Sequence, residues 1–193
     1  MSSGLTSSAP GAAPARRRRL AELPAGRNLE VRPASSMELP DLADLLLEKI
    51  PGLVAPFSSF ARVHSHSKSI FSVINGGSIV GCFACLHLND RGLERLLEGS
   101  LLMTEPDLSC LAESGEPAEA IYAWAWAMRP PTNGIKAMGS FMAWLERHQF
   151  AAAEIYGRPA TDKGFGFARN LDFQPVKKKT MKNQGLWVTS RCA

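Results

Sequence analysis

Apolar residues recur along most of the chain at two spacings, and the order of these spacings predicts strands interspersed with helices. A short apolar stretch first predicts a strand over 29–33. The next apolar residues lie three or four positions apart behind Ser35-x-x-Glu38, a pattern typical of a helix start, and they predict a helix over 36–49. A second, shorter helix is predicted over 57–65.

The middle of the chain predicts a hairpin followed by an insert. Two stretches rich in β-branched and aromatic residues, 69–74 and 78–88, flank a pair of glycines and predict two antiparallel strands. The residues from 90 to 116 lack a sustained apolar period. They predict an insert with a short helix over 93–102, and its purpose stays open.

The second half of the chain predicts strands and helices in alternation. Large and small residues alternate over 118–129, which predicts a strand that two prolines end. Small side chains on one face leave room for something to lie against it. Trp124 and Trp126 are two positions apart, so we expect both on the same face. The later patterns predict a helix, a strand, a helix and two strands, at 136–148, 151–156, 162–170, 173–180 and 185–190.

The order of these elements predicts the fold class. Strand–helix–strand connections in the second half join strands that run parallel, whereas the hairpin joins antiparallel ones. We therefore expect an α/β fold, with a central twisted mixed sheet flanked by helices. A chain of this length, without its first residues, fits a single domain with a real hydrophobic core.

The positive charge of the chain is concentrated near its first residues. The formal net charge is +4, and residues 1–27 carry five arginines against one glutamate, which leaves the remainder neutral. This stretch is rich in Ser, Ala, Gly and Pro, so we expect a disordered basic tail at 1–27 and one domain over 28–193. A neutral domain has no general field for nucleic acid, and no apolar run is long enough to span a bilayer. We expect neither partner.

The four cysteines indicate a reducing compartment. No apolar segment follows the arginine cluster as it would in a secretory signal, so we expect a cytoplasmic protein with free thiols. Cys82 and Cys85 have the spacing of half a metal site, but no second pair follows at a suitable distance. Strand residues three apart point to opposite faces, so we predict no metal site.

The segment from 118 to 176 carries the most functional information. An alternating strand stops at prolines, a glycine-containing turn opens a helix, and a further strand and helix end in Asn170-Leu-Asp-Phe-Gln-Pro-Val176. In element order and local sequence this segment resembles the GNAT superfamily of acyl-CoA N-acyltransferases. The resemblance implies the GNAT-like fold for the domain, and acetyl-CoA or another acyl-CoA as its cofactor.

That family holds the pyrophosphate of coenzyme A at a glycine-rich turn and helix start. Unpaired N–H groups and the positive end of the helix dipole favour an anion there. The best match is Gly134-Ile-Lys-Ala137-Met-Gly139, which lacks the leading Gln or Arg and has Ala137 in place of a glycine. A shift of one residue puts Asn133 at the leading position. An ordinary strand–turn–helix junction would have the same pattern.

The resemblance assigns candidate cofactor contacts residue by residue. The pyrophosphate would lie against the helix start, at Lys136, Ala137, Met138, Gly139 and Ser140. The pantetheine arm would follow the end of the preceding strand, at Ala127, Met128 and Arg129. The thiol end or the adenine side would be flanked by the next helix, at Thr161, Phe165 and Arg169.

The catalytic signature of the family is incomplete. Ala168 stands where many members carry the tyrosine that protonates the departing thiolate. Tyr156 and Glu154 are therefore the candidate acid and base, with a packed aromatic ring and an exposed structural carboxylate as the alternative reading. His64 and His66 are candidates for the wall of an acceptor pocket.

These features predict direct transfer of an acyl group, in the simplest case acetyl, from coenzyme A to an amine in a ternary complex. The acceptor, a small amine, an amino-acid derivative or a protein amino group, stays open. One alternative is a GNAT-like binding or regulatory module that has lost its chemistry. Another is a transferase of longer acyl chains, with the strand around Trp124 facing the chain; that strand could also line an aromatic acceptor pocket.

Overall fold

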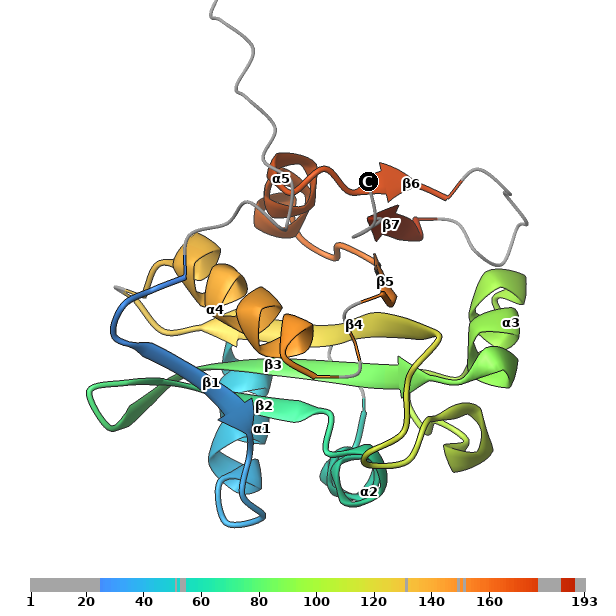
Figure 1. Ribbon diagram of the computed structural model, residues 1–193, viewed down its shortest axis with the longest axis horizontal. Coiled ribbons are helices and arrows are strands. Elements are labelled where there is room, and N and C mark those ends of the chain that lie inside the picture. The colour runs from blue at the N-terminus through green and yellow to red at the C-terminus, as the bar shows by residue number, and fades with distance from the viewer. Residues whose placement is uncertain are drawn as a thin grey trace, which may run out of the picture.

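Figure 1 shows the computed structural model of the chain, which describes residues 25–50, 52, 55–130, 132–148, 150, 152–176 and 185–189. Within these residues a seven-stranded sheet is flanked by helices. The strands are β1 (Leu29–Pro33), β2 (Ile70–Asn75), β3 (Ser78–Leu88), β4 (Ala120–Met128), β5 (Glu154–Gly157), β6 (Gln174–Pro175) and β7 (Trp187–Thr189). The helices are α1 (Leu39–Lys49), α2 (Phe57–Ser67), α3 (Asp90–Glu98), the 3-10 turn η2 (Leu108–Cys110), α4 (Gly134–Glu146) and α5 (Asp162–Asn170).

The sheet is mixed, as the strand–helix–strand connections predict. Its order is β1-β2-β3-β4-β5-β7-β6. The first four strands are antiparallel neighbours, β4 and β5 run parallel, and β5, β7 and β6 are again antiparallel. The crossover between the parallel strands is α4, which follows the rule that such strands need a long connection. The predicted α/β class with a central mixed sheet is confirmed.

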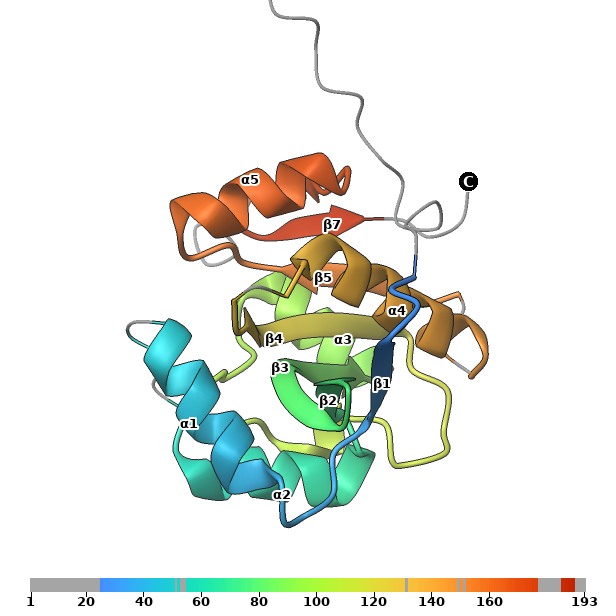
Figure 2. The same cartoon turned by 90° about the vertical axis from the view of Figure 1, so that its left-hand side faces the viewer.

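The helices cover both faces of the sheet (Figure 2). α4 and α5 bury their apolar sides on one face, in a core that contains Phe71, Phe83 and Phe141. The ring centroid of Phe141 on α4 lies 4.8 Å from that of Phe83 and 5.1 Å from that of Phe71, which fixes α4 on β2 and β3. α1, α2 and α3 cover the opposite face. Among the described residues no helix is long and apolar enough to cross a membrane.

Side-chain caps shift two helices from their predicted positions. α3 begins earlier than predicted because the Asn89 side chain accepts a hydrogen bond from the amide of Gly92. It ends earlier as well, at Gly99, whose φ of 73° suits a glycine. α4 begins at Gly134 because Asn133 is its N-cap residue. Both shifts follow from the side-chain amide of an asparagine.

The described part of the chain begins at residue 25, three residues before the predicted start of the domain, and that boundary stays a prediction. The amide of Gly26 donates to Ser140 Oγ of α4 (3.1 Å), and the amide of Leu29 donates to Gly26 O (3.0 Å). These two bonds hold the segment before β1 against α4. The rest of the predicted tail, residues 1–24, lies outside the described residues.

A partly buried ion pair joins three elements at the start of α1. Glu38, the N-cap residue, accepts hydrogen bonds at its two carboxylate oxygens from the guanidinium of Arg32 on β1 (2.7 and 2.9 Å). The carboxylate also accepts from the amide of Ser35 (2.7 Å) and from Ser72 Oγ of β2 (3.1 Å). The sequence predicted Ser35 as the cap of a helix from 36, but α1 begins at Leu39 and Glu38 is its N-cap residue. Arg32 and these further donors lower the pKa of Glu38 to about 2.

We expect Glu38→Gln to lower the free energy of unfolding at neutral pH by about 2 kcal/mol, because hydrogen bonds to a charged group are lost. The pKa of Glu38 in the folded state lies below its ordinary value of 4.5. Its contribution is therefore complete above that value and is lost as the pH falls toward 2. Urea denaturation across this range should show the two proteins converging in acid.

Glu48→Gln is the matched control, because it removes an exposed carboxylate near the other end of α1. We expect its free energy of unfolding to stay close to that of the wild type. Equal losses for the two variants would contradict the assigned role of Glu38.

Candidate functional site

The parallel neighbours β4 and β5 separate midway along β4 (Figure 1). β5 pairs with β4 only as far as Ala123↔Gly157, whereas β4 continues along β3 to Met128. Pro159, two residues beyond the last pair, has no N–H to donate to a ladder, which helps to end the pairing. We call Ala123 and Gly157 the branch point. The side of β4 residues 124–128 that faces away from β3 is called the free edge.

The free edge carries backbone groups that the sheet does not use. The amide of Arg129 donates to Val80 O of β3 (2.7 Å). Hydrogen-bonded positions alternate along an antiparallel pair, so the amide of Ala127 is also directed to β3. The amides of Trp126 and Met128 therefore lie on the free edge, where no described strand pairs with them. Of the three expected pantetheine contacts, only Met128 has its amide there.

α4 begins shortly after β4 ends, and its first turn is capped by the chain itself. Asn133 Oδ1 accepts hydrogen bonds from the amides of Ile135 (3.0 Å) and Lys136 (3.3 Å). The side chain of Lys136 is exposed. A helix start with its positive dipole end, a flanking lysine and a replaceable cap has the chemistry of an anion site.

The residues expected around the pyrophosphate lie mostly one turn further into α4. The amide of Ala137 donates to Asn133 O (3.0 Å), an ordinary bond within the helix. Ala137–Ser140 are buried, and their amides belong to the helix interior. The prediction that this range presents free amides is wrong, because the Asn133 cap sets the helix start at Gly134. Only Lys136, of the five expected contacts, belongs to the first turn.

α5 presents Phe167, rather than Phe165, to the start of α4. A Cβ atom on Gly134 would lie 3.8 Å from the Phe167 ring. Phe165 is two positions away, on the far side of the helix, and 40% exposed. Thr161, which caps α5, and Arg169 lie four positions before and after Phe165 and share its outer side. Phe167 is therefore the α5 ring next to the start of α4. The expectation that Phe165 flanks the thiol end or the adenine side of the cofactor stays a prediction.

A β-bulge lies next to the branch point. Ala84 pairs with Ala125, and Cys85 pairs with Ala123, so Trp124 is an extra residue with no partner in β3. Such a bulge bends its strand and increases the local twist. It therefore marks the place where β4 leaves β5. The sequence contains no turn residue that would reveal it.

The bulge also places the two tryptophans of β4 on opposite faces. The ring centroid of Trp124 lies 6.2 Å from that of Phe60 on α2, while that of Trp126 lies 5.4 Å from that of Phe83, on the α4 face. The indole N–H of Trp124 donates to Met103 O of the insert (3.0 Å). The prediction that both rings share a face is wrong, because an extra residue resets the alternation of side chains.

Two tyrosines lie at the branch point. Tyr122 of β4 is opposite Tyr156 of β5, and both are buried. The hydroxyl of Tyr156 donates to Glu154 Oε2 (2.7 Å). Burial, and then this bond to Glu154, raises the pKa of Tyr156; burial also raises the pKa of Tyr122, and Arg158 partly offsets it. The structure thus brings the two candidate catalytic residues into direct contact.

The two histidines expected at an acceptor wall hold α2 to its neighbours instead. His64 Nδ1 accepts from the amide of Ile70 (3.3 Å), so its Nε2 donates to Ala34 O (2.9 Å). Burial lowers the pKa of His64, which keeps the ring neutral at pH 7. A ring nitrogen of His66 lies 3.4 Å from Leu111 O of the insert. Both side chains are committed to structural bonds.

The insert covers the side of the branch point that faces α2 and α3. Its buried apolar residues share a core with the two tyrosines and include Leu96, Leu101, Cys110 and Leu111. Arg62 of α2 donates to Pro106 O (3.1 Å), which attaches the insert to that helix. The insert therefore removes the tyrosines from bulk water, which accounts for the desolvation that raises each pKa.

Cys82 and Cys85 lie on opposite faces of β3, as strand geometry predicts. Cys85 belongs to the core under α4, and Cys82 belongs to the core under α1 and α2. Both are buried, and burial raises the pKa of Cys85 to about 12. The pair does not converge on one ion. In the part of the chain that the structure describes, no three His, Cys, Asp or Glu side chains gather as metal ligands would.

Comparison with solved structures finds proteins of similar fold. The chain is similar to Ard1 from Thermoplasma volcanium, at 12% identity and a TM-score of 0.50 over 83% of this chain and 95% of that one. It is similar to the GNAT-like decarboxylase GphF in complex with isobutyryl-CoA, at 14% identity and a TM-score of 0.50 over 82% and 96%. No family model and no curated protein matches the sequence.

A third similar structure is N-acetylglutamate synthase from Neisseria gonorrhoeae, complexed with coenzyme A and L-arginine. The identity is 13% and the TM-score 0.50, over 84% of this chain and 33% of that chain. The chain thus spans about a third of that protein. At such identities the comparisons show the fold, and they confirm the GNAT-like fold that the sequence predicts.

We expect the folded protein to show no tyrosinate absorbance until it unfolds. The pKa of each tyrosine is raised above the ordinary value of 10, so the neutral phenols stabilise the fold below that pH and the stabilisation is lost above it. Absorbance at about 295 nm and far-UV circular dichroism should therefore change together in an alkaline titration.

The sequence has two tyrosines, so Tyr122→Phe leaves Tyr156 as the single probe. In the Tyr122→Phe protein, Glu154→Gln should lower the pKa of Tyr156, because the residue that accepts the hydrogen bond of the phenol no longer carries a negative charge. An absorbance change that precedes unfolding in the Tyr122→Phe protein would contradict the buried Tyr156–Glu154 pair.

Proposed function

We propose that this protein binds an acyl-CoA along the free edge of β4 and transfers the acyl group to an amine. The observation that carries the proposal is the early end of β4–β5 pairing, which leaves the amides of Trp126 and Met128 without strand partners next to a helix start. Two solved structures of similar fold are complexes with coenzyme A and with isobutyryl-CoA, which supports the cofactor class. Function still has to be argued from the site rather than from the fold.

The pantetheine arm suits the free edge because it contains two amide groups. An extended amide chain can add to an unpaired strand edge through backbone hydrogen bonds. The amides of Trp126 and Met128 are the donors for it. The carbonyl between them on the same edge is the acceptor, so the arm replaces the part of β5 that is missing beyond the branch point.

The diphosphate would lie at the first turn of α4. Gly134, Ile135 and Lys136 supply the amides, and Lys136 adds a positive charge. The Asn133 side chain accepts from two of these amides, and both hydrogen bonds are exposed to solvent. A diphosphate would displace the Asn133 side chain, because charged acceptors form stronger hydrogen bonds than an amide oxygen does. Phe167 would flank the site; the contacts of Thr161, Phe165 and Arg169 with the cofactor stay predictions.

The reaction needs no reactant beyond the thioester and the amine. The neutral amine attacks the thioester carbonyl carbon, a C–N bond forms, the C–S bond breaks, and coenzyme A leaves as a thiolate. The amine gives up one proton and the thiolate takes up one. An amide of the free edge would stabilise the oxyanion that forms in between.

Tyr156 and Glu154 would carry the proton of the amine. The phenol oxygen would receive this proton while its own passes to Glu154 along the existing 2.7 Å hydrogen bond. No tyrosinate forms in such a relay. The raised pKa of Tyr156 is therefore compatible with the role, whereas it would oppose one that requires the ionised phenol.

We propose only the class of the acceptor, which is an amino group on a small molecule or on a protein. Cys82, Cys85 and Cys110 are buried and free, which supports a reducing, cytoplasmic location. A binding module without turnover is the second candidate, and one observation favours it: no acidic side chain occurs on β4.

Asn133→Asp should weaken the binding of coenzyme A at least tenfold. An aspartate keeps the cap and suits the helix dipole, so the melting temperature without ligand should not fall. Its charge would lie where the diphosphate has to bind. Isothermal titration with coenzyme A and with acetyl-CoA measures the loss.

Asn133→Ser is the matched control, since serine caps helices about as well and adds no charge. It should bind like the wild type. Unchanged affinity in Asn133→Asp would contradict the phosphate site. Release of free thiol from acetyl-CoA on addition of amines would separate a transferase from a binding module, which would bind without release.

A further inference from the structure

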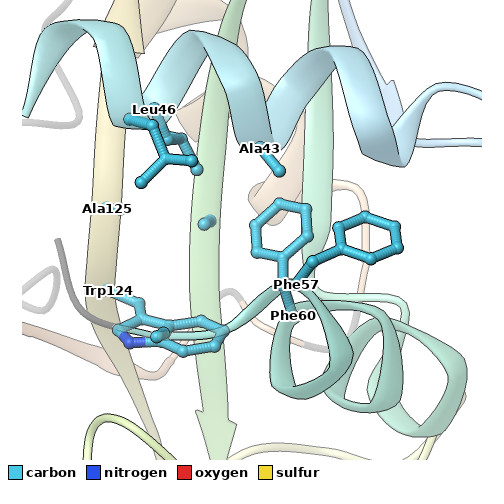
Figure 3. Close-up of a pocket in the computed structure, with 9 residues that line it drawn as sticks. Ala43, Leu46, Phe57, Phe60, Trp124 and Ala125 are labelled. Atoms are coloured by element: carbon cyan, nitrogen blue, oxygen red, sulfur yellow. The ribbon is translucent and has the colours of Figure 1, made fainter.

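A small apolar pocket lies beside the bulge, between α1, α2, β3 and β4 (Figure 3). Small side chains leave the space at its floor and roof: Ala84 and Ala125 from the strands, and Ala43 from α1. Figure 3 shows the rings of Phe60 and Trp124 on two sides of it. The volume is about 40 Å³. The sequence already suggested that small residues on β4 leave room on one face.

The side chains that line the pocket are hydrocarbon, apart from the indole nitrogen of Trp124, which already has a hydrogen-bond acceptor. Every residue that lines the pocket is Ala, Leu, Phe or Trp. The indole N–H of Trp124 donates to Met103 O outside the pocket. Leu47 and Phe57 line the same pocket and remain 56% and 49% exposed. A polar group placed here would lose water and gain no hydrogen bond, so the ligand portion that fits is a hydrocarbon.

The pocket adjoins the place where the thioester would lie. Trp124 and Ala125 line it, and the neighbouring Trp126 contributes an amide to the free edge. The groups that could serve an amine, Tyr156 and Glu154, belong to the branch point and its separate core. Trp124 packs against both cores and lies between the two regions.

We propose that this pocket is an acyl-chain subsite and that the preferred donor is an acyl-CoA with a short hydrocarbon chain longer than acetyl. This inference rests on the proposed function. A single water-sized guest needs about 10–15 Å³ of such volume, so the pocket holds roughly three non-hydrogen atoms. An acetyl methyl leaves most of it empty. An acyl group of about four or five carbons fills it.

The test is a chain-length series measured by isothermal titration on the full protein with coenzyme A, acetyl-CoA, butyryl-CoA and octanoyl-CoA. Each buried methylene strengthens binding about fourfold, so butyryl-CoA, with two more methylenes, should bind roughly fifteenfold more tightly than acetyl-CoA. Octanoyl-CoA should bring no further gain.

Ala43→Leu fills the pocket from α1 and leaves the sequence of β4 unchanged. It should abolish the preference for butyryl-CoA and leave the affinities for coenzyme A and acetyl-CoA unchanged. Ala143→Leu on α4 is the matched control, because it adds the same atoms on the opposite face of the sheet, and it should retain the preference. Phe57→Ala changes the exposed mouth of the pocket and leaves the core intact, so it should weaken the binding of butyryl-CoA and octanoyl-CoA but not that of coenzyme A or acetyl-CoA.

The outcomes separate this inference from the proposed function. Absence of binding for every thioester and for coenzyme A would overturn both. Binding of coenzyme A with equal affinity for all chain lengths would overturn only the acyl subsite. Affinity that keeps rising to octanoyl-CoA, or a butyryl preference that survives Ala43→Leu, would also overturn it.

Discussion

The partial pairing of β4 with β5 is the constraint on which the rest of this structure depends. An unpaired strand edge in the middle of a sheet exposes N–H and C=O groups that must find a partner. The bulge at Trp124 and the missing donor at Pro159 produce that edge from opposite sides. A ligand with amide groups would complete the sheet at this point, through the backbone groups that β5 leaves unpaired.

A rigid core on each face keeps this edge in position. Under α4, Phe141 packs on Phe71 and Phe83, so the first turn of the helix is fixed relative to β4. Across the sheet, α1 is tied down by the Arg32–Glu38 pair, and the insert covers the tyrosines at the branch point. Binding groups that come from strand and helix ends can then stay in place without being part of the packed core themselves.

Element order and fold class followed from the sequence because apolar spacing reports which face of an element is buried. The missed details arise from single side chains. Asn133 stands before a glycine at a strand–helix junction, so its preference for the N-cap position was a usable signal for the start of α4. No residue in the sequence predicts the bulge at Trp124, because the bulge depends on how β3 and β4 pair. The alternation that predicted one face for Trp124 and Trp126 therefore failed at this bulge.

The position of Ala137 changes the argument about lost chemistry. In the sequence, an alanine in place of a family glycine favours an eroded phosphate turn. In the structure Ala137 lies in the second turn of α4, buried, with its amide bonded to Asn133 O, so its Cβ does not stand at the helix start. The glycine that does stand there is Gly134, where an added Cβ would make an ordinary contact with the Phe167 ring. The question of activity therefore moves from the phosphate turn to the branch point, where one hydrogen-bonded pair, Tyr156 and Glu154, would have to move the proton.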